Sequence, residues 1–241
     1  MTNPIDLQPT STLSPDGNAV ATAARWYGAY PAIVTDIKDP DGQGRLKIAL
    51  PWALDATTGR YDAWARLATL MAGNNRGSWF IPDVGDEVLV VFQGGEASFP
   101  IVIGAMWNGK DNPPDSMDGG GKNLHKVIRT RAGTTITLDD SKGVEHFSVE
   151  TPSGRKLVLS DGPESLLIKD DNGNSIHMTS KGVKITAGDK FEVECSKAVI
   201  TAGDLTVNAG VATFAGKIKA DTVEANSYIG QTYTNGSGNI F

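Results

Sequence analysis

The 241-residue sequence contains a single cysteine, Cys195, which excludes a disulfide within the chain and a cysteine-based zinc cluster. Only three histidines are present, and no two of them stand two or four residues apart, so we expect no zinc or iron site within one chain. No apolar run approaches the roughly 18 residues that a transmembrane helix needs. Residues 1–24 lack the charged and apolar segments of a secretory signal. We therefore expect a protein that is made in the cytoplasm and stabilised by packing.

The scarce residue types are also unevenly distributed along the chain. All five tryptophans lie within the first 107 residues, and no proline follows Pro163. Residues 1–120 carry 8 basic and 14 acidic side chains, whereas residues 121–241 carry 14 of each. The change falls at a proline- and glycine-rich stretch, 108–123, whose composition is typical of a linker. These differences predict two domains, and 28 glycines with 7% aromatic residues favour β structure with many turns.

Five segments of the first domain have the β-branched and aliphatic composition of strands. They are Tyr30–Asp36, Arg45–Leu50, Trp64–Leu70, Glu87–Phe92 and Pro100–Met106. The stretch between the first two, DPDGQG at 39–44, has the residues of a tight turn. Five short strands without a long helical period predict a small closed or partly open barrel such as the OB-fold.

Barrels of this type often bind nucleic acid, which requires a cationic groove lined with stacking aromatic side chains. The first domain instead carries a net charge of −6, and the turn between its first two strands contains Asp39 and Asp41. These charges would repel a phosphate backbone. We therefore expect no nucleic-acid partner and interpret the tryptophans as core or interface residues.

From residue 134 onward, the second domain repeats a short unit in which apolar and polar residues alternate. The last apolar residue of each unit recurs every 9–11 residues up to Met178 and every 7–8 residues from there to Phe214. Because strand side chains alternate between two faces, we expect one apolar face in each strand. The residues expected on that face are Ile136, Leu138, Phe147, Val149, Leu157, Leu159, Leu166, Ile168, Ile176, Met178, Val183, Ile185, Phe191, Val193, Ile200, Leu205, Val207 and Phe214.

A short fixed period predicts a solenoid or fibre, in which each unit buries its apolar face only by stacking on its neighbours. One chain could supply about three coils of a β-helix, but that helix would be thin and its edge strands would be open. Three intertwined chains would instead stack strands from all three along each side of a prism. The absence of proline after Pro163 fits a fibre in which every backbone N–H joins a ladder.

One stretch of the first domain, GSWFIPDVGDEVLVVFQGGEASFPIVIGAMW at 77–107, carries a specific resemblance. It resembles the OB domain of phage baseplate central spikes, the baseplate assembly protein V family, and of type VI secretion spike proteins. The matching positions are Trp79, Pro82, Val84, Gly85, Asp86, Glu87, Val88, Phe92, Gly94, Pro100, Gly104, Asn108, Pro113 and Pro114. These residues suit turns and strand starts, and none of them is expected to be catalytic.

A second stretch resembles the domain that follows the OB domain in those spikes. IRTRAGTTITLDD at 128–140 and TPSGRKLVLSD at 151–161 are similar to the start of the family's three-chain β-helix. The resemblance implies an all-β chain with an N-terminal OB-fold barrel and a trimeric intertwined β-helix needle that narrows towards the C-terminus. The implied parts are an N-terminal extension that is flexible or contacts a hub (1–25), the OB-fold domain (26–107), a linker (108–126), the shaft (127–225) and an apex segment (226–241).

Other residues that could indicate chemistry have simpler interpretations. Cys195 has the parity of the inward residues, so we expect it to be a small buried side chain. His146 and His177 alternate with inward residues and should face outward, while His125 leads into the shaft. DDNGN at 170–174 lacks the ligand pattern of a calcium loop and predicts an Asn-Gly hairpin turn.

No cluster of catalytic side chains is apparent, so we expect neither an enzyme nor a cofactor. Some spikes of this class carry a lysozyme domain between barrel and shaft, but the linker here is far too short for one. The resemblance implies a homotrimeric needle of a contractile injection machine, most directly the tail baseplate of a virion. Such a needle would contact a hub protein at its barrel and pierce the target cell's outer envelope when the sheath contracts. A surface- or carbohydrate-binding trimeric fibre and a β-helical enzyme are the alternatives.

The C-terminal segment departs from the family pattern. Many members end in a His-x-His pair that holds iron at the tip, whereas no histidine follows His177 here. Three chains would expose apolar side chains at this end, and such surfaces invite aggregation. We therefore expect no metal at the apex and a small covering tip protein, PAAR-like or an analogue; a tail folded over its own end is the alternative. The expected contact residues are Tyr228, Ile229, Tyr233, Ile240 and Phe241.

Overall fold

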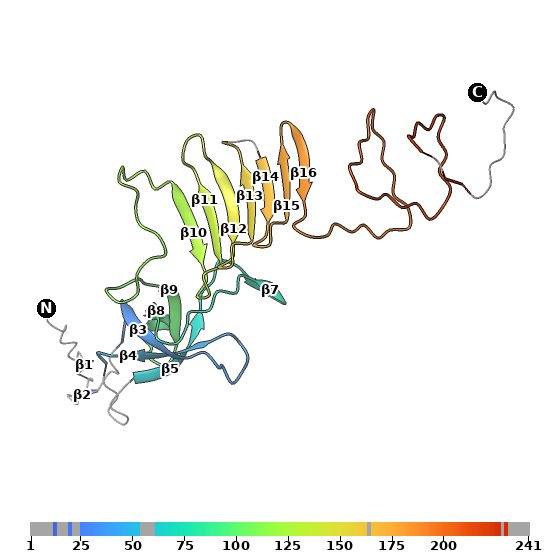
Figure 1. Cartoon of the computed structure of the whole chain (residues 1–241). Coiled ribbons are helices and arrows are strands. Elements are labelled where there is room, and N and C mark those ends of the chain that lie inside the picture. Colours follow the sequence, from blue (N-terminus) through green and yellow to red (C-terminus); the bar gives the residue numbers. More distant parts are fainter. Residues whose placement is uncertain are drawn as a thin grey trace. The chain divides into compact units, whose positions relative to one another are not determined.

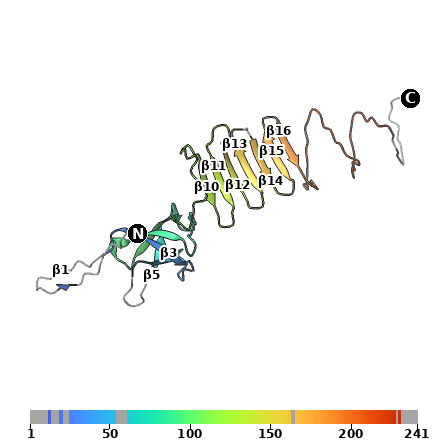
Figure 2. The same cartoon turned by 60° about the vertical axis from the view of Figure 1, so that its left-hand side comes forward.

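Figures 1 and 2 show a computed structural model of the chain in two views. The structure describes residues 12–13, 19–20, 25–53, 61–162, 165–227 and 229–230. It divides into two units, Met1–Lys190 and Phe191–Phe241, which are treated separately below. Regular structure in these ranges is β, apart from one short 3-10 helix, η1 (Gln93–Gly95), so the expected all-β fold class is confirmed. None of the described residues belongs to a helix with the length and apolar character of a membrane span.

Five strands of the first unit form a closed barrel in the order β3-β4-β5-β9-β8. Neighbouring strands are antiparallel except for β5 and β9, which run parallel. The small barrel expected from the sequence is therefore confirmed. The barrel strands are β3 (Ala29–Asp36), β4 (Leu46–Leu50), β5 (Tyr61–Leu67), β8 (Glu87–Phe92) and β9 (Pro100–Ala105). Two small hairpins lie outside the barrel: β1 (Thr12–Leu13) with β2 (Ala19–Val20), and β6 (Ala72–Gly73) with β7 (Arg76–Gly77).

Alternating side chains from these strands fill the barrel. In β8, for example, every second residue is buried, beginning with Val88. Trp26 packs against this core, with its ring centroid 4.8 Å from that of Phe92 and 5.4 Å from that of Tyr61. The buried core residues are Ala32, Val34, Leu46, Ile48, Leu50, Ala53, Ala65, Val88, Val90, Phe92 and Val102.

The third barrel strand is displaced from its expected position. The sequence predicted Trp64–Leu70, whereas the strand runs over Tyr61–Leu67. Its register is set by pairing with β4, in which Tyr61 lies opposite Leu50. Past Leu67 the chain leaves the barrel, the Thr69 hydroxyl donates to the Ser78 carbonyl at 2.9 Å, and Leu70 is fully exposed. Apolar composition alone could not show where the barrel closes.

The turn between β3 and β4 is built around the carboxylate of Asp39. This group accepts hydrogen bonds from the backbone N–H groups of Asp41 (3.1 Å), Gln43 (2.7 Å) and Arg45 (3.2 Å). It also accepts two from the Arg45 guanidinium, at 3.0 and 2.6 Å. The guanidinium holds the pKa of Asp39 well below its usual range. Both acidic residues expected to repel phosphate therefore pair with Arg45, Asp39 as a buried side chain and Asp41 as an exposed one.

We expect the Asp39→Asn variant to unfold its barrel at a lower temperature than the wild type at neutral pH, because an amide cannot form the ion pair with Arg45. A carboxylate with a lowered folded-state pKa stabilises the fold above its unfolded pKa, about 3.9, and this contribution is lost as the pH falls through the folded pKa. The difference in melting temperature should therefore shrink below about pH 4. Tryptophan fluorescence measures this in the full chain, since all five tryptophans lie within residues 26–107. Equal melting temperatures at neutral pH would contradict this stabilising role.

The rest of the first unit contains a seven-stranded antiparallel meander, in which each strand pairs with the next along the chain (Figures 1 and 2). Over these residues the ladder partners belong to the same chain. Strands from three chains were expected to form each ladder, whereas β10–β16 form their ladder within one chain. The strands are β10 (His125–Arg129), β11 (Thr135–Asp139), β12 (His146–Glu150), β13 (Lys156–Ser160), β14 (Ser165–Lys169), β15 (Ser175–Thr179) and β16 (Gly182–Thr186).

Three hairpin loops at the same end of the meander strands share one five-residue form: TRAGT at 130–134, TPSGR at 151–155 and DDNGN at 170–174. In each, the first N–H donates to the fifth carbonyl, and the fourth residue is a glycine with positive φ. In the third loop, the Asp170 carboxylate accepts from the side chain and backbone of Asn174, which lowers the pKa of Asp170 to about 2. The expected Asn-Gly hairpin turn is confirmed, and its carboxylate is engaged by the loop itself.

Regular strand structure ends with β16 in the described part of the chain. Residues 187–227 and 229–230 form no strand, and in the second unit all described side chains are exposed. This change falls where the sequence period shortens from about ten residues to seven or eight.

Candidate assembly interface

The pairing register of the meander brings the expected apolar residues into two parallel rows on one face, termed here the apolar face. Cross-strand partners share a face of a sheet, as do residues two apart in one strand. The first row is Ile136, Val149, Leu157, Ile168, Ile176 and Ile185, and the second is Leu138, Phe147, Leu159, Leu166, Met178 and Val183.

The described residues of the first unit leave the apolar face partly exposed. Its exposed side chains range from 37% accessible at Phe147 to 63% at Val183. Covering half of a leucine-sized side chain contributes about 1 kcal/mol to the free energy of association. Burying both rows would therefore contribute on the order of 10 kcal/mol per chain, as an upper estimate. A contiguous exposed apolar surface of this kind marks an interaction site.

The opposite face of the meander is largely polar. Its central row runs through Thr137, Ser148, Val158, Leu167, His177 and Lys184. Ser148 is the buried polar residue of this row, at 5% exposure. His146 and His177 lie on this polar face, as their alternation with apolar residues predicted. The meander is therefore amphipathic, with an apolar face suited to protein association and a polar face suited to contact with water.

One residue of the apolar face was missed in the sequence. Ile128 on β10 pairs with Ile136, extends the first row by one strand and is 47% exposed. It precedes the repeating units, and only the pairing of β10 with β11 reveals its place. In the second row, the corresponding position opposite Leu138 is Lys126, so that row ends at β11.

The remaining predicted core residues lie in the second unit and are not brought together by the chain on its own. They are between 62% and 72% exposed and lie outside any strand: Phe191, Val193, Ile200, Leu205, Val207 and Phe214. Cys195 is also exposed. Their inward placement in an assembly stays a prediction.

The expected apex contacts fall mostly outside the described part of the chain. Tyr228, Tyr233, Ile240 and Phe241 lie outside it, and Ile229 is 96% exposed. Of the N-terminal extension, 1–25, the structure describes residues 12–13, 19–20 and 25.

Titratable side chains form one notable group, at the start of the meander. His125, Asp139 and His146 occupy successive positions of one row on the polar face. The Asp139 carboxylate lies 3.4 Å from His125 Nε2 and 3.8 Å from His146 Nδ1. Across the described ranges, no three His, Cys, Asp or Glu side chains converge as metal ligands would.

Two domain families match this chain in the order of its parts. Residues 30–107 match the type VI secretion system/phage-baseplate injector OB domain, and residues 146–213 match the phage baseplate V C-terminal trimerisation domain. The first match coincides with the barrel, and the second covers β12–β16 and the start of the second unit. Together they cover more than half of the chain.

Similar curated proteins are named type VI secretion system spike proteins. VgrG1b of Pseudomonas aeruginosa is 27% identical over 128 residues, which cover 50% of this chain and 17% of the relative. VgrG1a of the same organism is 28% identical over 134 residues, which cover 52% of this chain and 21% of the relative. VgrG3 of Vibrio cholerae is 29% identical over 123 residues, which cover 49% of this chain and 11% of the relative. The aligned part thus spans about a fifth or less of the length of these relatives.

Proposed function

Because the chain belongs to the family of spike proteins that phage baseplates and type VI secretion injectors share, we propose that three copies of it form the central spike of a contractile injection machine. The observation that carries the proposal is the apolar face of the meander. Both rows are continuous over six strands, partly exposed among the described residues of the first unit and largely contained in the matched trimerisation domain. Three such faces packed around one axis would bury both rows.

The role of such a trimer is mechanical. Contraction of a sheath would drive the needle through the outer envelope of a target cell. Stiffness would come from the intrachain ladders of the meander and, from residue 187 onward, from ladders between chains. Chains interlocked in this way cannot leave one at a time, which slows unfolding.

We place the machine in a phage tail baseplate and thus in a virion. The description of the second matched domain names the phage baseplate alone, which supports this choice, whereas that of the first names both machines. The alternative is a type VI secretion injector, to which the similar VgrG proteins belong.

Partners beyond the second and third copies are also part of the proposal. A baseplate hub protein would contact the barrel, and a small tip protein would cover the apex around Ile229, whose side chain is 96% exposed. Neither nucleic acid nor a catalytic substrate is included, because the matched segments are the structural part of the spike.

Labelling of the chain in its parent particle tests the proposed function. A small epitope inserted in the β14–β15 loop at 170–174 would be located by gold-labelled antibody in purified particles. We expect label at the distal end of the tail tube in particles that carry a head. Label confined to headless, cell-attached tubes would assign the chain to a secretion injector, and label absent from both would contradict the spike role.

A further inference from the structure

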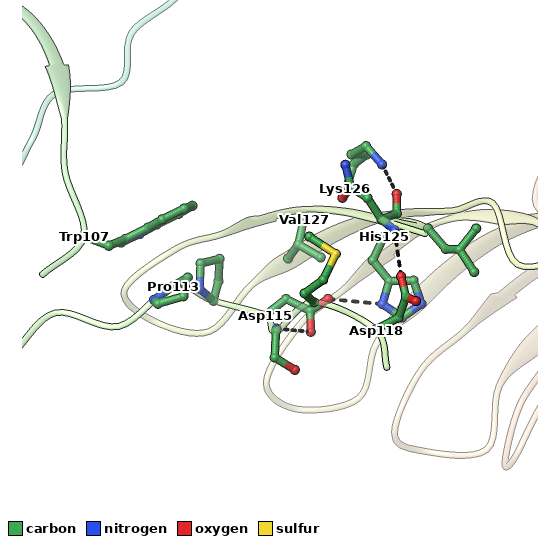
Figure 3. A pocket seen from close by; sticks show the side chains of 12 residues that line it. Trp107, Pro113, Asp115, Asp118, His125, Lys126 and Val127 are labelled. Carbon is green, nitrogen blue, oxygen red and sulfur yellow. Dashed lines mark hydrogen bonds and ion pairs between the residues drawn. The ribbon is translucent and has the colours of Figure 1, made fainter. Parts of the chain in front are cut away.

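His125 lies where the linker meets the first strand of the meander, with a carboxylate on each side of its ring. Figure 3 shows the linker side of this arrangement, where Asp115 lies beside the ring of His125. Its Nδ1 lies 3.1 Å from Oδ2 of Asp115, a linker residue. Its Nε2 lies 3.4 Å from Oδ2 of Asp139, its cross-strand partner on β11. One imidazole therefore bridges the linker and the second strand of the meander; this pair of contacts is termed the His125 bridge.

The linker segment that carries Asp115 is already folded into a turn. The Asp118 carboxylate accepts hydrogen bonds from the backbone N–H groups of Gly120 (3.0 Å), Lys122 (3.0 Å) and Asn123 (2.7 Å). The turn returns the chain to β10, whose first residue is His125. Asp115, three residues before Asp118, contacts the meander through His125.

The protonation state of the imidazole decides whether both contacts can form. A neutral imidazole has one N–H donor and one acceptor nitrogen, whereas an imidazolium has two donors. An ionised carboxylate is an acceptor only. The pKa of Asp115 is lowered by the Ser116 backbone N–H and by His125, and that of Asp139 by Ser141 and the nearby histidines, so both stay ionised. Only the imidazolium can therefore donate to both carboxylates.

Other charged groups around the ring do not replace these contacts. On β12, His146 faces the same Asp139 carboxylate at 3.8 Å, but its Nδ1 also lies 2.9 Å from the Val144 carbonyl. Lys126 on β10 directs its ammonium to the carbonyl of Asn123. In the linker, the Asp118 carboxylate is occupied by backbone donors.

The bridge is accessible to protons. The side chains of His125 and Asp115 are 46% and 40% exposed. The bridge also lies on the polar face of the meander, so packing of the apolar faces in a trimer leaves it uncovered.

We propose that the His125 bridge holds the linker against the meander in a pH-dependent way. It is closed when the imidazole carries both protons and open when one proton is lost. Imidazole groups titrate between about pH 5 and pH 8, so the linker is held more tightly on the acidic side of neutrality. The bridge forms within one chain and therefore stands independently of the proposed spike function.

Amide hydrogen exchange of the linker in the full chain tests this proposal. Exchange of the peptide covering residues 115–124 would be measured at about pH 5.5 and about pH 8 and corrected for intrinsic rates. We expect about fivefold lower protection at the higher pH, the effect of losing half-exposed charge pairs. Light scattering at both pH values checks that the assembly state is unchanged.

Three variants make the result specific. His125→Phe should give low protection at both pH values, and His125→Arg, whose cation persists at both, should remove the pH dependence. His177→Phe, on the same face but away from the linker, should behave as the wild type. Equal protection of the wild type at both pH values, or pH dependence that persists in His125→Phe, would overturn the proposal. If His125→Phe does not fold, Asp115→Asn at the exposed linker must lower protection at about pH 5.5; unchanged protection there would equally overturn it.

Discussion

The Ile176→Asp variant is expected not to assemble, whereas the wild type is expected to form a trimer. Ile176 lies in the middle of the first apolar row, between Ile168 and Ile185. In a trimer closed by the apolar faces, the substitution would place three carboxylates in one dry layer. A buried carboxylate without a partner costs each chain several kcal/mol, against a burial gain whose upper estimate is on the order of 10 kcal/mol per chain, and the three carboxylates also repel one another. Native mass spectrometry of the purified variant measures the loss directly.

His177→Asp is the matched control for this substitution. His177 is the next residue of the same strand, points to the polar face and pairs with Leu167 and Lys184. An aspartate there would lie beside a lysine in water, so the trimer should persist. Assembly of Ile176→Asp as readily as His177→Asp would show that the apolar face is not the interface.

Residues 191–227 are expected to be strongly protected from amide exchange in the assembled wild type and unprotected in Ile176→Asp. No strand forms in this segment, and its side chains are exposed in the chain on its own. Its ladder partners must then come from other copies. The meander, 125–186, has its ladder within the chain and should keep part of its protection in the variant. Protection of the segment in the trimer should exceed that in the variant by about a thousandfold or more.

Peptide-resolved exchange of the two proteins under identical conditions provides this comparison. The barrel serves as an internal control, because its closed sheet and buried core lie within one chain. If residues 191–227 exchange freely in the trimer, the interchain ladder does not exist. If they are protected in the variant, the chain orders this segment without a partner.

Much of the fold could be predicted because local pattern and turn chemistry agreed. Glu87–Phe92 was predicted with its observed bounds, since its continuous apolar run lies between Gly85 and Gly94, both of which adopt positive φ. The two apolar rows followed from period-two alternation, which fixes the face of every residue once one is known. The displaced third barrel strand shows the limit, because closure of the barrel and not composition ends it at Leu67.

Pairing between strands could not be predicted from the same pattern. Alternation tells which face a side chain takes, but not whether the neighbouring strand belongs to the same chain, so the intrachain ladder of the meander emerged only from the structure. For the same reason, alternation could not show that His125, Asp139 and His146 share one row. Their spacing along the chain, 14 and 7 residues, is set by hairpin lengths. Ile128 escaped notice in this way too.

The mass of the purified full chain in solution tests the central claim most directly. Multi-angle light scattering should give about 76 kDa, three copies of the 25.4-kDa chain, over a wide range of concentration. The trimer should also survive SDS without heating, because interlocked chains separate slowly. A stable, folded species of 25.4 kDa would contradict the trimeric spike.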